Sequence, residues 1–195
     1  MPEFNYFGRL ALVDYRTFVP IVAQAYLARP VFEESAAPAW VALRDNTNRL
    51  FKQMSRKVNV VFTEQDPYPD FEAMQRDIEN NRRMLIWTGA SDHGVWTPEE
   101  NWRFRAVHDY MVHLAGGHLF TLRGEMAAYN RHVKIAPPRA RPALFAEVVG
   151  QVCTYLYLDN QFPPQKICQL YGFDYVNVGL WNAVDYERNF LHSSS

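Results

Sequence analysis

Two short runs, Val58-Asn-Val-Val-Phe-Thr63 and Arg83-Met-Leu-Ile-Trp-Thr88, decide the fold class of this chain. Both are rich in β-branched and aromatic residues, which is typical of short buried strands. Between them, Asp70 can cap a helix over residues 71–81 through its carboxylate. A strand, a helix and a strand in this order predict a small parallel βαβ unit.

Helical patterns flank this unit on both sides. Thr97 and Glu100 form a capping box around Pro98, which marks the start of a helix that ends near the Gly116-Gly117 pair. The tail from Pro163 is expected to be irregular or short-helical. Together these patterns predict a mostly helical α+β fold with a small βαβ unit, built as a single domain over residues 1–195. Four other segments are expected to be helical: 17–28, 37–57, 122–133 and 142–158.

Composition and charge argue against several classes of protein. With 48% hydrophobic and 15% aromatic residues, the chain is typical of a globular protein with a bulky core. Its formal net charge of −1 gives no overall field that would attract nucleic acid or acidic lipid. There is no secretory signal and no apolar run of about 20 residues, so no membrane role is expected. The two cysteines, Cys153 and Cys168, are too few for a disulfide framework, which favours a reduced, cytoplasmic protein.

Two histidines and two glutamates gather in the second half of the chain. His108 and His113 lie on the capped helix, Glu125 on the next helix and Glu147 on the third. Two His and one carboxylate, with coordination positions left open, form the ligand set of non-haem Fe(II) oxygenases, and a catalytic Zn²⁺ accepts the same ligands. His108, His113 and Glu147 are the expected metal ligands. Glu125 is the alternative third ligand. If Glu147 binds the metal, Glu125 is expected to contact the ligands and not the metal itself.

The spacing of the two histidines sets a geometric condition. Residues five apart are separated by about 140° on an ideal α-helix, against about 40° for residues four apart. His108 and His113 therefore converge on one metal only if the helix frays or carries a π-type bulge near His113. The Gly116-Gly117 pair that follows is consistent with an early helix end.

Other polar residues near these ligands are expected to serve the site. Asp109 is placed to accept a ring proton from a metal-bound histidine and so to fix its tautomer. Arg105 offers a bidentate fork for a substrate carboxylate or phosphate. Gln151 shares a helix face with Glu147 and would bind substrate or orient a ligand. The Asp92-His93 pair, just before the capped helix, is a looser candidate.

Three motifs follow one another in the second half of the chain: V-H-D-x-x-x-H over 107–113, G-E-x-x-A over 124–128 and A-R-P-A-L-F-x-E-x-x-G-Q over 140–151. Their order resembles a family of uncharacterised proteins found mainly in bacteriophages and bacteria. This resemblance implies a phage or bacterial origin and a cytoplasmic location, but no particular activity.

A more remote resemblance concerns the histidine pair and Glu147. His108-Asp109-Tyr-Met-Val-His113 matches the motif H-[DE]-x-x-G-H except that Val112 replaces the glycine, and Phe145-Ala-Glu147-Val-Val-Gly150 is similar to F-T-x-E-F-G. Both motifs belong to the pterin-dependent aromatic amino acid hydroxylases. The resemblance implies that His108, His113 and Glu147 are Fe(II) ligands. The chain is short and has no recognisable pterin-binding segment, so whether pterin or a 2-oxoacid is needed stays open.

The expected function is that of a mononuclear non-haem Fe(II) oxygenase or hydroxylase acting on a small molecule. One alternative is a Zn-dependent hydrolase with Glu125 as general base. Another is a non-enzymatic phage structural or accessory protein, in which the same residues form a metal-free hydrogen-bond network. The oxygenase hypothesis requires an open coordination sphere beside an apolar pocket. The non-enzymatic one requires His108, His113 and Glu147 to be distant from one another or paired with protein groups.

Overall fold

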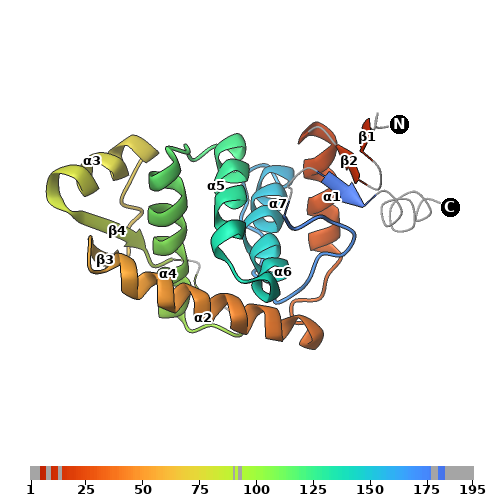
Figure 1. Cartoon of the computed structure of the whole chain (residues 1–195), viewed down its shortest axis with the longest axis horizontal. Helices are drawn as coiled ribbons and strands as arrows, with labels where there is room; N and C mark the ends of the chain where they lie inside the picture. Colours follow the sequence, from red (N-terminus) through yellow and green to blue (C-terminus); the bar gives the residue numbers. More distant parts are fainter. Residues whose placement is uncertain are drawn as a thin grey trace.

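The helices pack side by side along the long axis of the molecule, with a small sheet towards each end (Figure 1). The computed structural model describes residues 5–7, 10–12, 15–89, 91, 94–176 and 180–182, so the Asp92-His93 candidate lies outside the described residues. Helix α2 (Ala37–Met54) runs lengthwise across the helices of the second half of the chain. The mostly helical composition and the two-stranded parallel sheet confirm the expected α+β class.

The parallel βαβ unit forms one end of the molecule. Strand β3 (Asn59–Thr63) pairs in parallel with β4 (Arg83–Trp87), and helix α3 (Phe71–Asn81) connects them. The Asp70 carboxylate accepts the N–H of Ala73 at 2.7 Å, as the N-cap prediction requires. Arg82 adopts a left-handed φ of 51°, which ends α3 and turns the chain into β4. The predicted unit and its cap are confirmed.

Helices α1 (Tyr15–Leu27) and α2 form the N-terminal part of the core. They are joined through a short 3₁₀ turn, η1 (Glu34–Ala36). Trp40 of α2 is fully buried, and its indole Nε1 donates to the Cys168 carbonyl at 3.1 Å. Both helices lie within a few residues of their expected bounds. The hydrogen bond from Trp40 shows that Cys168, far along the chain, contacts α2 directly.

The second half of the chain contains two helical rods, each interrupted by a π-helical segment. A π-helix closes i→i+5 hydrogen bonds, and such segments often occur at functional sites. The first rod comprises α4 (Pro98–His108) and η2 (Asp109–Leu114). The second comprises α6 (Arg141–Leu144), η4 (Phe145–Gly150) and α7 (Gln151–Tyr157), preceded by the 3₁₀ turn η3 (Pro138–Ala140). Helix α5 (Leu122–Ile135) lies between the rods (Figure 1).

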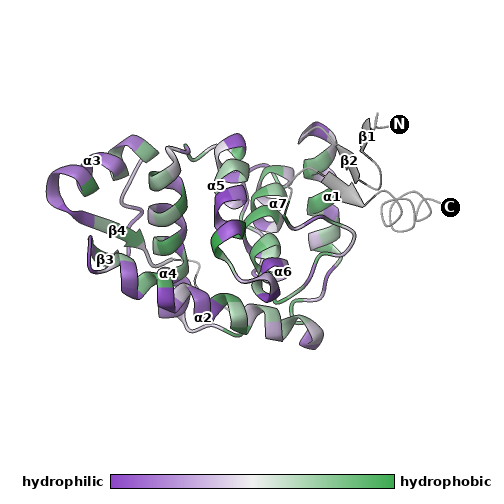
Figure 2. Ribbon diagram, in the orientation of Figure 1, coloured by the Kyte–Doolittle hydropathy of each residue, from purple (hydrophilic) through white to green (hydrophobic). Residues whose placement is uncertain are grey.

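Hydrophobic residues concentrate on the helices in the middle of the molecule, whereas α3 and much of α2 carry hydrophilic ones (Figure 2). Trp40, Tyr129 and Phe145 are among the largest fully buried side chains. Gly150 permits a close approach between η4 and α1, because a Cβ there would lie 2.8 Å from the ring of Tyr26. The second rod and Phe104 of the first rod lie in one large hydrophobic cluster, and Ala106 and Val107 of the first rod lie in a second cluster.

A three-stranded antiparallel sheet joins the two ends of the chain, and the sequence patterns do not predict it. It has the strand order β1 (Asn5–Phe7), β2 (Leu10–Leu12) and β5 (Leu180–Asn182). The first third was expected to be helical and the tail irregular or short-helical. Strands of three residues are too short to show a period of two, and the pairing of Leu12 with Leu180 joins residues far apart in sequence.

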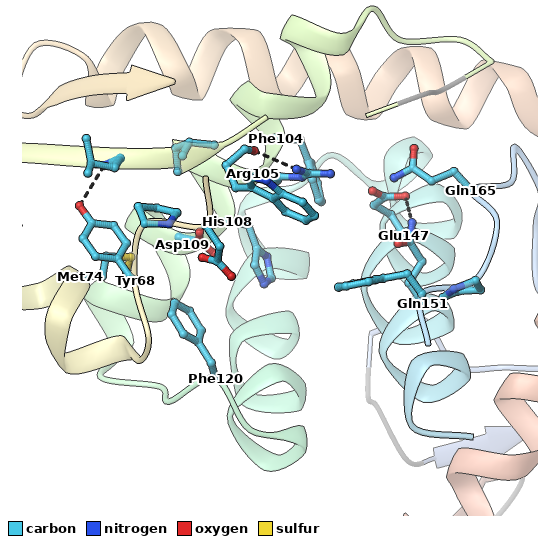
Figure 3. A pocket seen from close by; sticks show the side chains of 17 residues that line it. Tyr68, Met74, Phe104, Arg105, His108, Asp109, Phe120, Glu147, Gln151 and Gln165 are labelled. Atoms are coloured by element: carbon cyan, nitrogen blue, oxygen red, sulfur yellow. Dashed lines mark hydrogen bonds between the residues drawn. The ribbon is translucent and has the colours of Figure 1, made fainter. Parts of the chain in front are cut away.

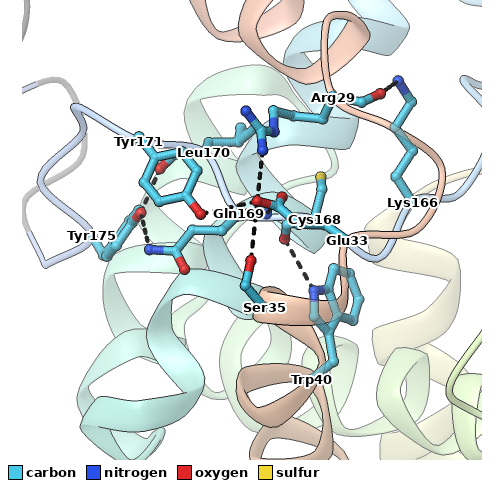
Figure 4. A network of polar contacts seen from close by, with 10 residues as sticks. All are labelled: Arg29, Glu33, Ser35, Trp40, Lys166, Cys168, Gln169, Leu170, Tyr171 and Tyr175. Carbon is cyan, nitrogen blue, oxygen red and sulfur yellow. Dashed lines mark hydrogen bonds and ion pairs between the residues drawn. The ribbon is translucent and has the colours of Figure 1, made fainter.

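A polar network fixes the segment over 163–175 to the region between α1 and α2 (Figure 4). Glu33 accepts hydrogen bonds from Arg29 at 2.6 Å and from Tyr171 at 3.0 Å. The Lys166 ammonium is buried and satisfies carbonyls at the C-terminal end of α1, which the helix itself leaves unpaired. Its Nζ donates to the carbonyls of Tyr26, Leu27 and Arg29 at 3.0, 2.9 and 2.6 Å.

Candidate metal centre

Three donor atoms converge between α4 and α5: Nε2 of His108, Nε2 of His113 and Oε2 of Glu125. The two nitrogens are 3.1 Å apart, and Oε2 lies 3.4 Å from His108 Nε2 and 3.3 Å from His113 Nε2. Metal–ligand bonds of about 2.0–2.2 Å place neighbouring donors about 3.0–3.5 Å apart in octahedral or tetrahedral coordination. The three side chains could therefore hold one metal ion without rearranging.

The π-helical segment η2 brings the two histidines together. Helix α4 ends at His108, and η2 continues the rod from Asp109 to Leu114. Residues five apart diverge on an α-helix, but in a π-helix they lie about one turn apart on the same face. The prediction that convergence requires a π-type bulge here is confirmed. Both side chains are largely enclosed, with His113 0% and His108 8% exposed.

Helix α5 places Glu125 in its first turn, facing both histidines. Thr121 caps this helix by accepting the N–H of Gly124 at 3.2 Å. A Cβ on Gly124 would lie 1.8 Å from the carbonyl oxygen of Leu119, so this close approach requires glycine. Gly124 thus allows the tight turn that places the Glu125 carboxylate beside the two histidines.

The loop that precedes α5 fixes the tautomer of His113. The His113 Nδ1 lies 2.8 Å from the carbonyl oxygen of His118. A carbonyl only accepts hydrogen bonds, so Nδ1 must carry a proton and donate it. In a neutral His113 the lone pair is then on Nε2, directed at His108 and Glu125, as metal binding requires.

A third histidine side chain, that of His132 of α5, contacts the cluster from the side of His108. The Nδ1 atoms of the two rings lie 3.1 Å apart, and His132 is fully buried. Phe104 stacks on both rings, with centroid separations of 6.1 Å to His108 and 5.7 Å to His132. No role for His132 is expected from the sequence. Its seven-residue spacing from Glu125, two helical turns, is the signal that points to it.

The ionisable groups of the cluster shift one another's pKa values. Burial tends to raise the pKa of Glu125, but hydrogen bonds and charges from His108 and His113 outweigh it and lower the pKa to about 2. Burial tends to lower the pKa of His113, and the hydrogen bond and charge of Glu125 reverse this and raise it. The site therefore favours a carboxylate beside a positive charge, the role that a bound divalent cation would take.

Glu147 and Gln151 lie across the cleft from the histidines. Figure 3 shows both side chains on the wall opposite His108. Gln151 Nε2 donates to Glu147 Oε2 at 2.6 Å, and burial raises the pKa of Glu147 to about 8. The carboxylate that the structure places with His108 and His113 is that of Glu125, the rival ligand. Glu147, expected as the third ligand, is not part of this group.

Arg105 and Asp109 border the same cleft (Figure 3). Arg105 Nη1 donates to the main-chain carbonyls of Trp87 at 2.9 Å and Gly89 at 2.6 Å. Its guanidinium carbon also lies 5.6 Å from the ring centroid of Trp87. These contacts tie Arg105 to the end of β4. Asp109 is partly buried at the start of η2, and burial raises its pKa.

Two adjoining cavities of about 360 and 540 Å³ form a cleft beside the cluster, and Figure 3 shows the smaller of the two. Cavities of this size are typical of small-molecule sites. His108 borders both cavities and Glu125 borders the larger one, whereas His113 is fully buried behind them. The cluster therefore presents one side to the cleft. Six residues line both cavities: Phe104, His108, Phe120, Glu147, Gln151 and Phe162.

Comparison with known proteins adds no family to this description. No protein-family model, curated protein or solved structure matches the chain. Within the described parts of the chain, no helix combines the length and the apolar character needed to cross a membrane.

Proposed function

We propose that this protein is a mononuclear non-haem Fe(II) enzyme, an oxygenase or hydroxylase, whose metal ligands are His108, His113 and Glu125. The observation that carries the proposal is the triangle of donor atoms, with sides of 3.1, 3.3 and 3.4 Å. Two imidazoles and one carboxylate leave the remaining coordination positions open, as Fe(II) oxygenases require. Bound there, Fe(II) would supply the positions at which O₂ and substrate meet.

The positions of the three ligands indicate that protein would enclose a bound ion on one side only. His113 is enclosed by protein and anchored through its Nδ1 to the His118 carbonyl. His108 and Glu125 stand at the border of the cleft. The open positions of an ion at this site would therefore face the cleft, where a small molecule can approach.

The cleft walls favour a substrate with an apolar body and few polar groups. Aromatic side chains run from the cluster to the surface, from Phe104 at 5% exposure to Phe162 at 69%. The hydrogen-bonded Glu147 and Gln151 offer polar contacts on the facing wall. Arg105, tied to two main-chain carbonyls, would shape the wall more than it would grip an anion. Asp109 does not take the proton-accepting role expected of it, because His113 Nδ1 contacts the His118 carbonyl and His108 Nδ1 contacts His132.

A catalytic Zn²⁺ is the second candidate, because the same two histidines and carboxylate suit zinc with one bound water. Glu125 would then be a ligand rather than the general base. Glu147 would be the candidate acid or base, since it borders the cleft and burial raises its pKa to about 8. The reaction would be a hydrolysis, with no need for O₂.

The test is metal uptake by matched variants. Wild-type protein, Glu125→Gln and Glu147→Gln are incubated anaerobically with Fe(II) alone and, in parallel, with Zn(II) alone, because zinc outcompetes iron at most sites of this kind. The samples are then desalted and measured by elemental mass spectrometry. Both substitutions convert a carboxyl group into an amide of the same size, at a partly buried position for Glu125 and at a buried one for Glu147. We expect about one equivalent of iron in the wild type and in Glu147→Gln, and at least a tenfold weaker uptake in Glu125→Gln.

Each other outcome has a definite meaning. Zinc in place of iron at the same residues would favour the hydrolase. Loss of metal in Glu147→Gln with retention in Glu125→Gln would make Glu147 the ligand. A wild-type protein that takes up neither metal would overturn the proposal and favour the non-enzymatic phage protein, with the cluster as a hydrogen-bond network.

A further inference from the structure

His132 and His108 are joined by a hydrogen bond between two like nitrogen atoms. Their Nδ1 atoms are 3.1 Å apart, and their ring planes are inclined by 38°. A neutral imidazole carries one N–H and one lone pair, so one Nδ1 must donate and the other must accept. The tautomers of the two rings are therefore linked.

The surroundings of His132 keep its ring neutral. The side chain is fully buried, and its Nε2 has no hydrogen-bond partner among the described residues. Phe104 covers one face of the ring, with an interplanar angle of 22°. A second proton on this ring would leave a charge without a partner.

Two proton arrangements satisfy the neutral pair. In the first, His132 Nδ1–H donates to His108 Nδ1, and His108 carries its proton on Nε2, 3.4 Å from Glu125 Oε2. In the second, His108 Nδ1–H donates to His132 Nδ1, and His132 carries its proton on Nε2. Each arrangement contains two ring protons, so the histidine pair can change from one arrangement to the other without releasing a proton. Only the second leaves a lone pair on His108 Nε2 for a metal ion.

The unpartnered Nε2 of His132 decides which arrangement the metal-free protein adopts. In the first arrangement this buried nitrogen carries a lone pair and no proton, and Glu125 receives a hydrogen bond from His108. In the second arrangement it is a buried N–H without an acceptor, which is the costlier defect, and Glu125 loses its donor. The first is therefore favoured without metal, and a metal–nitrogen bond at His108 offsets the cost of the second.

We infer that His132 is a positioning residue that sets the tautomer of His108. In the metal-free protein it donates to His108 Nδ1, so that the proton of His108 is on Nε2 and is donated to Glu125. When a metal binds, His132 accepts the Nδ1 proton of His108 instead. The inference rests on the proposed metal site and adds a residue outside its three ligands. A hydrogen-bonded partner of this kind normally contributes to metal affinity through the orientation and basicity of the ligand.

The direct test is nuclear magnetic resonance of ¹⁵N-labelled histidine rings in the full chain, before and after addition of one equivalent of Zn(II). We expect His108 to be protonated on Nε2 without metal and on Nδ1 with Zn(II), and His132 to change in the opposite sense. His113 should keep its Nδ1 proton throughout. An unchanged His132 tautomer on Zn(II) binding would overturn the inference.

Two variants at position 132 separate positioning from packing. His132→Gln keeps a side-chain oxygen that can accept the His108 proton, whereas His132→Leu fills similar space without an acceptor. We expect Zn(II) to bind His132→Gln within about threefold of the wild type and His132→Leu about ten- to hundredfold more weakly, the usual effect of losing such a partner. Equal affinities in the two variants would overturn the inference. If His132→Leu does not fold, the wild-type spectra still decide.

Failure of the inference can be told from failure of the metal site. Stoichiometric metal uptake with an unchanged His132 tautomer would leave the proposed function standing and remove the role of His132. If the wild type takes up no metal, the proposed function falls, and with it the role of His132 in positioning a ligand.

Discussion

The Nε2 atoms of His108 and His113 lie 3.1 Å apart, with ring planes inclined by 71°. Two lone pairs facing each other at this distance repel, so the pair is stable only with a proton or a cation between or beside the nitrogens. Glu125 lies within 3.4 Å of both and supplies the negative charge that a cation would share. The helical rod α4–η2 thus holds an arrangement that a metal ion would stabilise.

Changing the length of η2 tests this arrangement. Inserting one alanine after Tyr110 places the histidines six residues apart, about 240° on an α-helix, and should weaken Zn(II) binding at least hundredfold. Deleting Tyr110 leaves them four apart, about 40° on a regular α-helix, and should keep the affinity within about tenfold. Competition with a chromophoric chelator measures both, and circular dichroism checks helix content. Wild-type affinity in the insertion variant would contradict the role of the π-helix.

Glu147 should make the protein lose stability as the pH rises. Burial raises its pKa from 4.5 in the unfolded chain to about 8 in the folded protein. The folded state therefore keeps a proton that the unfolded state releases, so this contribution is complete below pH 4.5 and is lost as the pH rises through 8. Glu147→Gln has no such loss and should be more stable than the wild type by on the order of 3 kcal/mol at pH 7.

Urea unfolding of the wild type and Glu147→Gln between pH 4 and 8.5 measures this difference. The two curves should nearly coincide at the acid end and separate as the pH increases. A gap that is the same at every pH would mean that packing, and not ionisation, distinguishes the two proteins.

Gly124→Ala should destabilise the protein, although alanine normally stabilises a helix by about 1 kcal/mol relative to glycine. The reason is the clash of the new Cβ with the Leu119 carbonyl oxygen, at 1.8 Å in the present backbone. Moving this loop would also displace the His118 carbonyl from His113, so Zn(II) affinity should fall at least tenfold. Arg123→Ala, at an exposed position one residue earlier, is the control and should change neither quantity. Thermal unfolding and chelator competition give the two readouts.

Lys166→Met should unfold at a clearly lower temperature than the wild type. The substitution keeps an unbranched apolar stem but removes the donor to three carbonyls at the end of α1. The Tyr26 carbonyl still accepts the N–H of Arg29 at 3.1 Å, but the partly buried carbonyls of Leu27 and Arg29 lose their donor. An unsatisfied buried carbonyl costs about 1–3 kcal/mol, which water partly relieves here. Lys134→Met removes an exposed ammonium from α5 and is the matched control. Equal melting temperatures for the two variants would show that the network of Figure 4 does not stabilise the fold.

The helices and the βαβ unit could be predicted because their signals are local. The Asp70 cap and the Thr97–Glu100 capping box lie within four residues of the helix starts that they mark, and both are present in the structure. The antiparallel sheet could not be predicted in the same way. Its pairs, such as Leu10 with Asn182, depend on the folded core bringing the chain ends together.

Sequence alone determined that His108, His113, Glu125 and Glu147 lie on successive helical segments, and that the histidines meet only if the helix frays or carries a π-type bulge. Those conclusions follow from residue type and helical period, which are local properties. Only the tertiary structure decided which carboxylate joins the histidines. That choice depends on how α5 packs against η2 on one side and against η4 on the other, which places Glu125 within 3.4 Å of both nitrogens and Glu147 on the facing wall of the cleft.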